Sequence, residues 1–267
     1  MLRGASAEAL AELSQQAVRT RTLDDAATLG SQLFGVAAIV RHDVALRRAL
    51  TDSSVEGESR VGLARAVFEK ALAQPALDLV ADAAGRRWIS SNDLPDALER
   101  VAVAATVRSA GASGKQVGDE LFAVRQMISD NPSLRGTLSD TSRTADDRGQ
   151  LLLSLIDGKT LPATSVLVGQ AVTRQRGNVE SALQEYLDLA AAALEEGVAT
   201  VHTARELSAD EQTRLASALA KQYGKDIQLH VVVDPELIGG LRVEIGDDVI
   251  DGTVVSRLDE ARRRLAG

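Results

Sequence analysis

The stretch LGSQLFGVAAIVRHDVALRRALTD, residues 29–52, returns 88 residues later as VGDELFAVRQMISDNPSLRGTLSD at residues 117–140, without a gap. Eight of the 24 paired positions are identical, whereas average composition would give roughly one or two matches by chance. The same lag continues through pairs such as Arg60 with Arg148. We therefore interpret the middle of the chain as a duplicated unit.

Each copy has the pattern of a small helix bundle. Stretches with helical spacing of apolar residues are separated by polar turns, at residues 50–59 and 138–147, that supply Ser, Thr and Asp for helix N-caps. Aromatic residues are only 2% of the chain, so the cores must use Ala, Leu and Val, which suit closely packed helices. Biased composition could make two unrelated helices alike, but turns and spacing that match over about 60 residues argue against that alternative.

The pattern changes at about Gly197. Strand, helix and strand patterns follow one another between residues 198 and 233, and the helix begins with Ser208 and Glu211 at the spacing of a capping box. The predicted fold is mostly α, with two tandem helical bundles followed by a small mixed α/β domain. The predicted domains are a first bundle at residues 1–110, a second bundle at 111–196 and the α/β domain at 197–267.

Residues 233–258, VDPELIGGLRVEIGDDVIDGTVVSRL, combine four glycines with six acidic residues, so a phosphate or metal site must be considered. The glycines at 239–240 join two strands and do not open a helix, as a phosphate site would require. Asp247, Asp248 and Asp251 lack the alternating ligand spacing of a calcium loop. We therefore expect structural roles: strands on both sides of PELIGG, a turn after the second strand, and Asp251 as the N-cap of a last helix.

Composition and motifs exclude several classes of function. A net charge of −8 and a pI near 5.0 give no basic surface for nucleic acid. The absence of cysteine excludes disulfides, thiolate catalysis and zinc–thiolate sites. The pair at residues 114–115 has Ser109 and Gln116 where a phosphate loop needs Gly and Ser or Thr. The three histidines are scattered: His42, His202 and His230. No catalytic residues, cofactor or metal are therefore predicted.

No segment of the sequence has the character of a membrane anchor. The first residues lack the apolar core of a secretory signal, and apolar runs such as FGVAAIV at 34–40 are too short to cross a bilayer. We expect no direct membrane insertion and a reducing compartment, so any membrane association must come through a partner.

The C-terminal motifs carry a resemblance to a known family. They are Gly239, Gly240, Gly246, Asp247, Asp251, Gly252 and Arg257, within the runs GGL, GD, IDGT and RL. This pattern resembles the signature of the delta subunit of F-type ATP synthase, the bacterial relative of the mitochondrial oligomycin-sensitivity-conferring protein. The order of a helical bundle, a strand, a helix and a strand hairpin is also similar. Members usually have one bundle, and the doubled bundle resembles the form found in high-GC Gram-positive bacteria.

The resemblance implies a non-catalytic stator subunit in the peripheral stalk of the ATP synthase, at the cytoplasmic face of the cell membrane. It implies that a helical bundle receives N-terminal segments of alpha subunits and that the C-terminal domain binds the b-type stalk subunit. A cytosolic helical-repeat adaptor is the alternative, and an enzyme with an unrecognised site is a weaker one. The sequence leaves open whether the chain is a free subunit or the delta portion of a b–delta fusion.

The resemblance also implies where the alpha segment binds: in a groove between the first and fifth helices of a bundle. The corresponding residues are Leu79, Val80, Ala83 and Trp88 in the first copy, and Leu167, Val168 and Ala171 in the second. The second copy precedes the C-terminal domain directly, as the single bundle of other members does, but only the first has an aromatic anchor. The plainer interpretation of Trp88 is a half-buried anchor against its own bundle, and a contact with a partner is the alternative. We expect the second copy to be the receptor.

Overall fold

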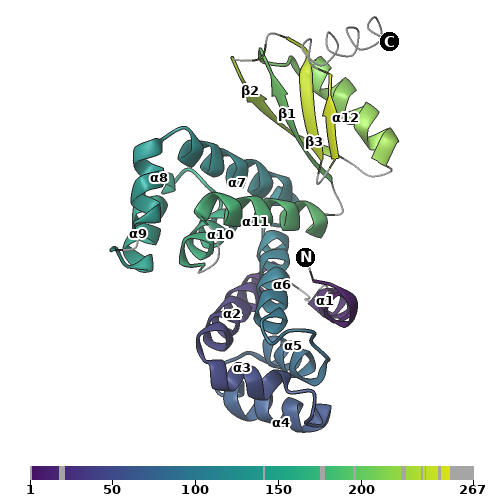
Figure 1. Ribbon diagram of the computed structural model, residues 1–267, viewed down its shortest axis with the longest axis vertical. Helices are drawn as coiled ribbons and strands as arrows, with labels where there is room; N and C mark the ends of the chain where they lie inside the picture. The colour runs from purple at the N-terminus through teal and green to yellow at the C-terminus, as the bar shows by residue number, and fades with distance from the viewer. Residues whose placement is uncertain are drawn as a thin grey trace, which may run out of the picture. The chain divides into compact units, whose positions relative to one another are not determined.

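The computed structural model describes residues 2–17, 22–140, 142–174, 178–194, 197–223, 227–235, 237, 239–245 and 248–252. The chain divides into two compact units, Met1–Ala190 and Ala191–Gly267. The first is built from helices and the second combines a sheet with a helix (Figure 1), so the fold is mostly α, as predicted. Within the described ranges, every helix is too short or too polar to cross a lipid bilayer.

The helical unit begins with the helices of the first copy, which are α1 (Gly4–Ala17), α2 (Leu23–His42), α3 (Val44–Thr51), α4 (Gly57–Phe68), α5 (Gln74–Gly85) and α6 (Asp93–Ser109). A short 3-10 turn, η1 (Gly111–Ser113), leads to α7 (Gly114–Ser129), α8 (Pro132–Ser139), α9 (Ala145–Ile156), α10 (Pro162–Thr173) and α11 (Val179–Ala193).

Three consecutive helices of the second copy repeat those of the first. The bounds of α8, α9 and α10 each lie 88 residues after the bounds of α3, α4 and α5. The turns repeat as well. The Asp52 carboxylate accepts hydrogen bonds from the N–H and hydroxyl of Ser54 at 2.9 and 2.7 Å, and Asp140 accepts the same pair from Ser142 at 2.9 and 2.6 Å. The duplication inferred from the sequence is therefore present in the local structure.

A tertiary hydrogen bond repeats at the same lag. The N–H of Ala73 donates to Gln32 Oε1 at 3.1 Å, and the N–H of Leu161 donates to Glu120 Oε2 at 2.8 Å. Gln32 lies in α2 and Glu120 in the corresponding helix α7, and the donors are the residues just before α5 and α10. The two copies thus share tertiary structure as well as helix bounds.

The core of the first copy depends on a close approach of α2 and α6. A Cβ atom at Gly30 would lie 2.4 Å from Thr106 Oγ1 and 3.1 Å from the Ala102 carbonyl oxygen, so a larger residue would force the helices apart. Aliphatic side chains such as Leu33 and Leu98, both 0% exposed, fill the space around this contact. The core is therefore mainly aliphatic, as the composition predicts.

The second unit contains β1 (Gly197–Thr203), α12 (Ala209–Tyr223), β2 (Ile227–Val233), β3 (Leu241–Ile245) and β4 (Asp248–Asp251). The strands form one mixed sheet in the order β2-β1-β3-β4. Strand β1 pairs in parallel with β2 and antiparallel with β3, and β3 pairs antiparallel with β4. Alternate residues of the strands and one face of α12 form its core, centred on Ala199, Val201, Leu219, Ile227, Val243 and Ile245.

The capping box predicted for α12 is confirmed. The N–H of Glu211 donates to Ser208 Oγ at 3.3 Å, and the N–H of Ser208 donates to Glu211 Oε2 at 2.9 Å. The strands expected on both sides of PELIGG are present as β2 and β3, and β1 lies between them in the sheet. One expectation was wrong. Asp251 is the last residue of β4 and not the N-cap of a helix, because the chain forms a further strand after β3.

Candidate functional site

The residues predicted to line the receptor groove are buried inside the helical unit. On α5 and α10 each of them is at most 2% exposed: Leu79, Val80, Ala83, Leu167, Val168 and Ala171. They form the inner faces of these helices. A partner docked on the surface of a closed bundle would therefore not touch them directly.

Trp88 anchors the segment that follows α5. It is 8% exposed, and its indole Nε1–H donates to the carbonyl oxygen of Ala83 at 2.9 Å. The next residue, Ile89, donates its N–H to Ser6 Oγ on α1 at 2.9 Å and is itself 67% exposed. The segment thus ties α1 to the end of α5. Arg176, which corresponds to Trp88 in the second copy, lies outside the described residues.

The glycines of the C-terminal signature that the structure describes, at positions 239, 240 and 252, have backbone roles in or beside the sheet. Gly239 and Gly240 lie in the link before β3, and Gly240 has a φ of 84°, which favours glycine. The N–H of Gly252 donates to the carbonyl oxygen of Leu241 at 2.9 Å, and a Cβ atom at Gly252 would lie 3.2 Å from that oxygen. Asp251 is the cross-strand neighbour of Arg242. Three other signature positions lie outside the described residues: Gly246, Asp247 and Arg257. The helix expected after Asp251 lies outside them too.

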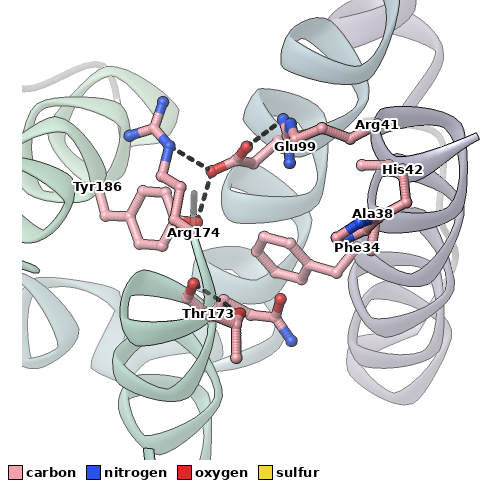
Figure 2. A pocket seen from close by; sticks show the side chains of 10 residues that line it. Phe34, Ala38, Arg41, His42, Glu99, Thr173, Arg174 and Tyr186 are labelled. Atoms are coloured by element: carbon pink, nitrogen blue, oxygen red, sulfur yellow. Dashed lines mark hydrogen bonds and ion pairs between the residues drawn. The ribbon is translucent and has the colours of Figure 1, made fainter. Parts of the chain in front are cut away.

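A cluster of charged side chains that sequence reasoning missed lies where the two copies meet. We call it the junction cluster, and it comprises Arg41 of α2, Asp96, Glu99 and Arg100 of α6, Arg174 after α10, and Glu185 and Tyr186 of α11. Figure 2 shows the Glu99 carboxylate with Arg41 on one side and Arg174 on the other. Side chains from both copies therefore share one buried carboxylate.

Glu99 is the most buried member of these acids, at 4% exposed. Its Oε2 lies 2.6 Å from Arg41 Nη2, and its Oε1 lies 3.2 Å from Arg174 Nε. The hydroxyl of Tyr186 donates to the same Oε1 at 2.6 Å. Three donors from three elements thus offset the cost of burying this charge.

The pairing continues outward from Glu99. Glu185 accepts a hydrogen bond from Arg174 at 2.6 Å and from Arg100 at 2.5 Å. Burial raises the pKa of Glu185, but the hydrogen bond and charge of Arg174 and the charge of Arg100 outweigh it, so that pKa lies below its ordinary value. The pKa of Tyr186 is raised, mainly by burial and then by the negative charge of Glu99 and the hydrogen bond to it. Glu185 is therefore charged and the phenol of Tyr186 is neutral at neutral pH.

A small pocket of about 100 Å³ opens beside the cluster (Figure 2). Phe34 and His42 of α2 line it, together with Thr173 and Arg174 and the ring of Tyr186. The centroids of the Phe34 and Tyr186 rings lie 6.3 Å apart. The carboxylates and guanidinium groups of the junction cluster bind one another and hold the surrounding helices together.

Two signals in the sequence point to the junction cluster in retrospect. Glu99 is the charged residue on the mainly apolar buried face of α6. Arg174 follows Arg86 at the lag of 88 residues. Neither signal predicts which residue the charge contacts, because the contacts form between segments far apart in the chain. Within the described ranges, no group of three or more His, Asp or Glu residues could hold a metal ion.

Comparison with known proteins gives a consistent family. Residues 100–265 match the family model described as ATP synthase delta (OSCP) subunit. ATP synthase subunit delta of a Nocardioides species is 50% identical, with 100% of this chain and 98% of the relative covered. ATP synthase subunit delta of Streptomyces coelicolor is 40% identical over 99% of this chain and 98% of the relative. A chain from the mitochondrial ATP synthase hexamer of Toxoplasma gondii aligns with a TM-score of 0.35 at 22% identity, over 62% of this chain and 95% of that one.

Proposed function

Because the chain belongs to the ATP synthase delta (OSCP) subunit family, we propose that its task is mechanical: it connects the head of the enzyme to the stalk that holds the head still. Family membership makes it a peripheral-stalk subunit of the F1Fo ATP synthase and not the adaptor considered as the alternative. The observation that carries this conclusion is the full-length relative with 50% identity, together with the match over residues 100–265.

The chain contributes no catalysis of its own in this proposal. The charged side chains of the junction cluster are bound to one another, and the signature glycines shape the sheet. We expect the isolated chain to hydrolyse no ATP and to bind nucleotide no tighter than about millimolar, which corresponds to roughly 4 kcal/mol. Isothermal titration calorimetry tests this, and micromolar ATP binding would contradict it.

In this proposal each of the two structural units binds a different partner. The helical unit receives N-terminal segments of alpha subunits, and the α/β domain binds the b-type stalk subunit. The division into functional parts follows the sequence, at residues 1–110, 111–196 and 197–267. ATP synthase is a membrane-associated complex, and we place this subunit on its cytoplasmic side, held there by its partners.

The receptor for the alpha segment belongs to the outer surface of the fifth helix in one copy. On α10, Val166 is 41% exposed, whereas the corresponding residue of α5 is Asp78, which pairs with Arg65 at 2.8 Å. The second copy thus offers an apolar contact where the first offers a charge that is already paired. An amphipathic helix docks through such apolar contacts. This supports the second copy as the receptor.

Binding of an alpha N-terminal peptide to the full chain tests this assignment. Val166→Asp should weaken binding about tenfold or more, because it replaces a contacting valine by a charge that the complex would desolvate. Val67→Asp on α4, where the valine is 44% exposed, is the matched control and should leave binding unchanged. Substitutions at the buried Val80 or Val168 would test folding first.

Each outcome of the binding measurement has a clear meaning. Loss of binding with Val166→Asp and retention with Val67→Asp supports the second copy. Equal binding by both variants and the unchanged chain contradicts the assignment of the receptor to the outer surface of α10. Co-purification of the chain with alpha and b subunits tests the wider stator function separately.

A further inference from the structure

The helix α6 corresponds in sequence to α1 and to α11. At a lag of 88 residues, EALAEL of α1 lies over DALERV of α6, and at a lag of 85 residues DALERV lies over SALQEY of α11. Three aligned positions face inward in α1, α6 and α11. They are Ala9, Ala97 and Ala182; Leu13, Val101 and Tyr186; and Ala17, Ala105 and Ala190. Each of these residues is at most 5% exposed. The same inward face is therefore used three times.

The contacts of the fifth helices place α6 at the start of the second copy. In the first copy, α5 packs mainly against α4, α2 and α1, with fewer contacts to α3 and α6. In the second copy, α10 contacts α9, α7 and α6. Since α9 corresponds to α4 and α7 to α2, the position of α1 is taken by α6. The same α6 also packs against α1, α2 and α5 of the first copy (Figure 1).

An arginine at the end of each fifth helix repeats this relation. Arg86 is the C-cap residue of α5 and pairs with Glu12 of α1. Arg174 is the C-cap residue of α10 and pairs with Glu99 of α6. In each copy the arginine therefore joins the fifth helix to the first. The difference is that Glu12 has a side chain that is 60% exposed, whereas that of Glu99 is 5% exposed.

The burial of α6 fits a helix with neighbours on most of its sides. Eleven of its 17 residues are buried, against eight of 20 in α2 and six of 16 in α7. Between residues 96 and 108 the residues that are not buried are spaced four apart: Asp96, Arg100, Ala104 and Arg108. That spacing leaves a single narrow stripe in contact with solvent.

We infer that α6 is used twice, as the last helix of the first bundle and the first helix of the second, and that Glu99 locks the second bundle onto it. The two copies then overlap and share a helix, so they form one mechanical body. The mechanical meaning rests on the proposed stator function, whereas the shared helix is tested on the isolated chain and stands or falls without any partner.

Glu99 is suited to this role because its charge cannot be left without partners. Its carboxylate is held by α2 of the first copy through Arg41, and by the second copy through Arg174 and Tyr186. Separating the bundles would leave the Glu99 carboxylate with only one of its three donors, Arg41. The cost of that separation couples the two bundles.

Native-state hydrogen exchange of the full chain tests the inference. In the unchanged chain, the slowest amides of α7–α10 should exchange through the same opening as those of α2–α6, because one body opens as a unit. Glu99→Gln keeps the shape but removes the charge. It should speed exchange in α7–α10 at least tenfold relative to α2–α6. Glu12→Gln, which removes the acidic partner of the corresponding arginine in the first copy, Arg86, should leave the α7–α10 rates within about twofold.

Two results would overturn the inference. One is an unchanged chain whose second bundle opens independently, at least tenfold faster than the first. The other is a Glu99→Gln variant with α7–α10 rates within twofold of the unchanged chain. Should Glu99→Gln fail to fold, Tyr186→Phe removes only the hydroxyl that binds Glu99. A threefold or greater rise in α7–α10 exchange then supports the inference, and a smaller change overturns it.

Discussion

Replacing Arg60 should test how the end of α5 is stabilised. Arg60 of α4 is 4% exposed, and its guanidinium donates to the carbonyl oxygens of Arg86 at 2.7 Å and Gly85 at 3.1 Å. Trp88 takes the carbonyl of Ala83 in the same turn. The last carbonyls of a helix have no partner within it, and a cation there also suits the helix dipole. Arg60→Met keeps the aliphatic stem but removes the charge and both bonds.

The magnitude follows from these bonds. Hydrogen bonds from a charged donor contribute about 1.5–3 kcal/mol each, so two give roughly 3–6 kcal/mol. Arg60 Nε is buried with no hydrogen-bond partner, and removing such a donor returns about 1–3 kcal/mol. The expected net loss is about 2–3 kcal/mol of unfolding free energy, or a melting temperature lower by roughly 5–10 °C for a unit of this size.

Urea denaturation followed by the fluorescence of Trp88, the single tryptophan, reports on this end of α5. Arg65→Met is the matched control on the same helix, because Arg65 has a side chain that is 44% exposed and pairs only at the surface with Asp78. It should cost no more than about 1 kcal/mol. Arg60→Lys, which keeps the charge with fewer donors, should fall between. An Arg60→Met cost equal to that of Arg65→Met would refute the capping role.

Two further predictions concern pH and folding. Hydrogen bonds from Arg205, and then from Ser208, lower the pKa of Glu211 to about 2. The charge of Glu211 therefore stabilises the capping box fully above the pKa of the unfolded chain, near 4.3. This stabilisation is lost as the pH falls toward 2. An NMR titration of this carboxyl should have its midpoint near 2, and a midpoint above about 4 contradicts the interaction. Residues 92–194, which include α6, should fold cooperatively by circular dichroism, whereas residues 112–194 should not. Cooperative folding of both fragments would show that the second bundle does not need α6.

Local structure was the part of the fold that could be read from the sequence. The duplication is visible because side chains that pack inside each copy had to keep their spacing, and the helix bounds follow that spacing. Ser208 and Glu211 identify the start of α12 because a capping box involves residues close in sequence. The order of the strands was not predictable in the same way. Strand β1 lies between β2 and β3, and such a pairing depends on how α12 crosses the sheet.

The site was harder to predict because apolar spacing does not distinguish two kinds of burial. Val80 and Val168 lie on the apolar face of a helix, which predicts that they are buried. The sequence does not show whether that face packs inside its own bundle or against a partner. The structure shows that their own bundles cover them. The junction cluster was missed for the opposite reason. Its charges look like solvated residues until Arg41 and Arg174 are seen to share Glu99.

The shared helix gives the extra copy a mechanical meaning. A second bundle joined by a flexible linker would add a hinge, because separate domains move relative to one another unless a large interface holds them. With 17 residues and a rise of 1.5 Å per residue, α6 is about 25 Å long. A force passing between the two bundles is therefore carried by the continuous backbone hydrogen bonds of α6. The contacts of Glu99 with both copies oppose separation of the bundles. For a subunit that must keep the head from turning, a second copy attached in this way extends the connection without making it more flexible.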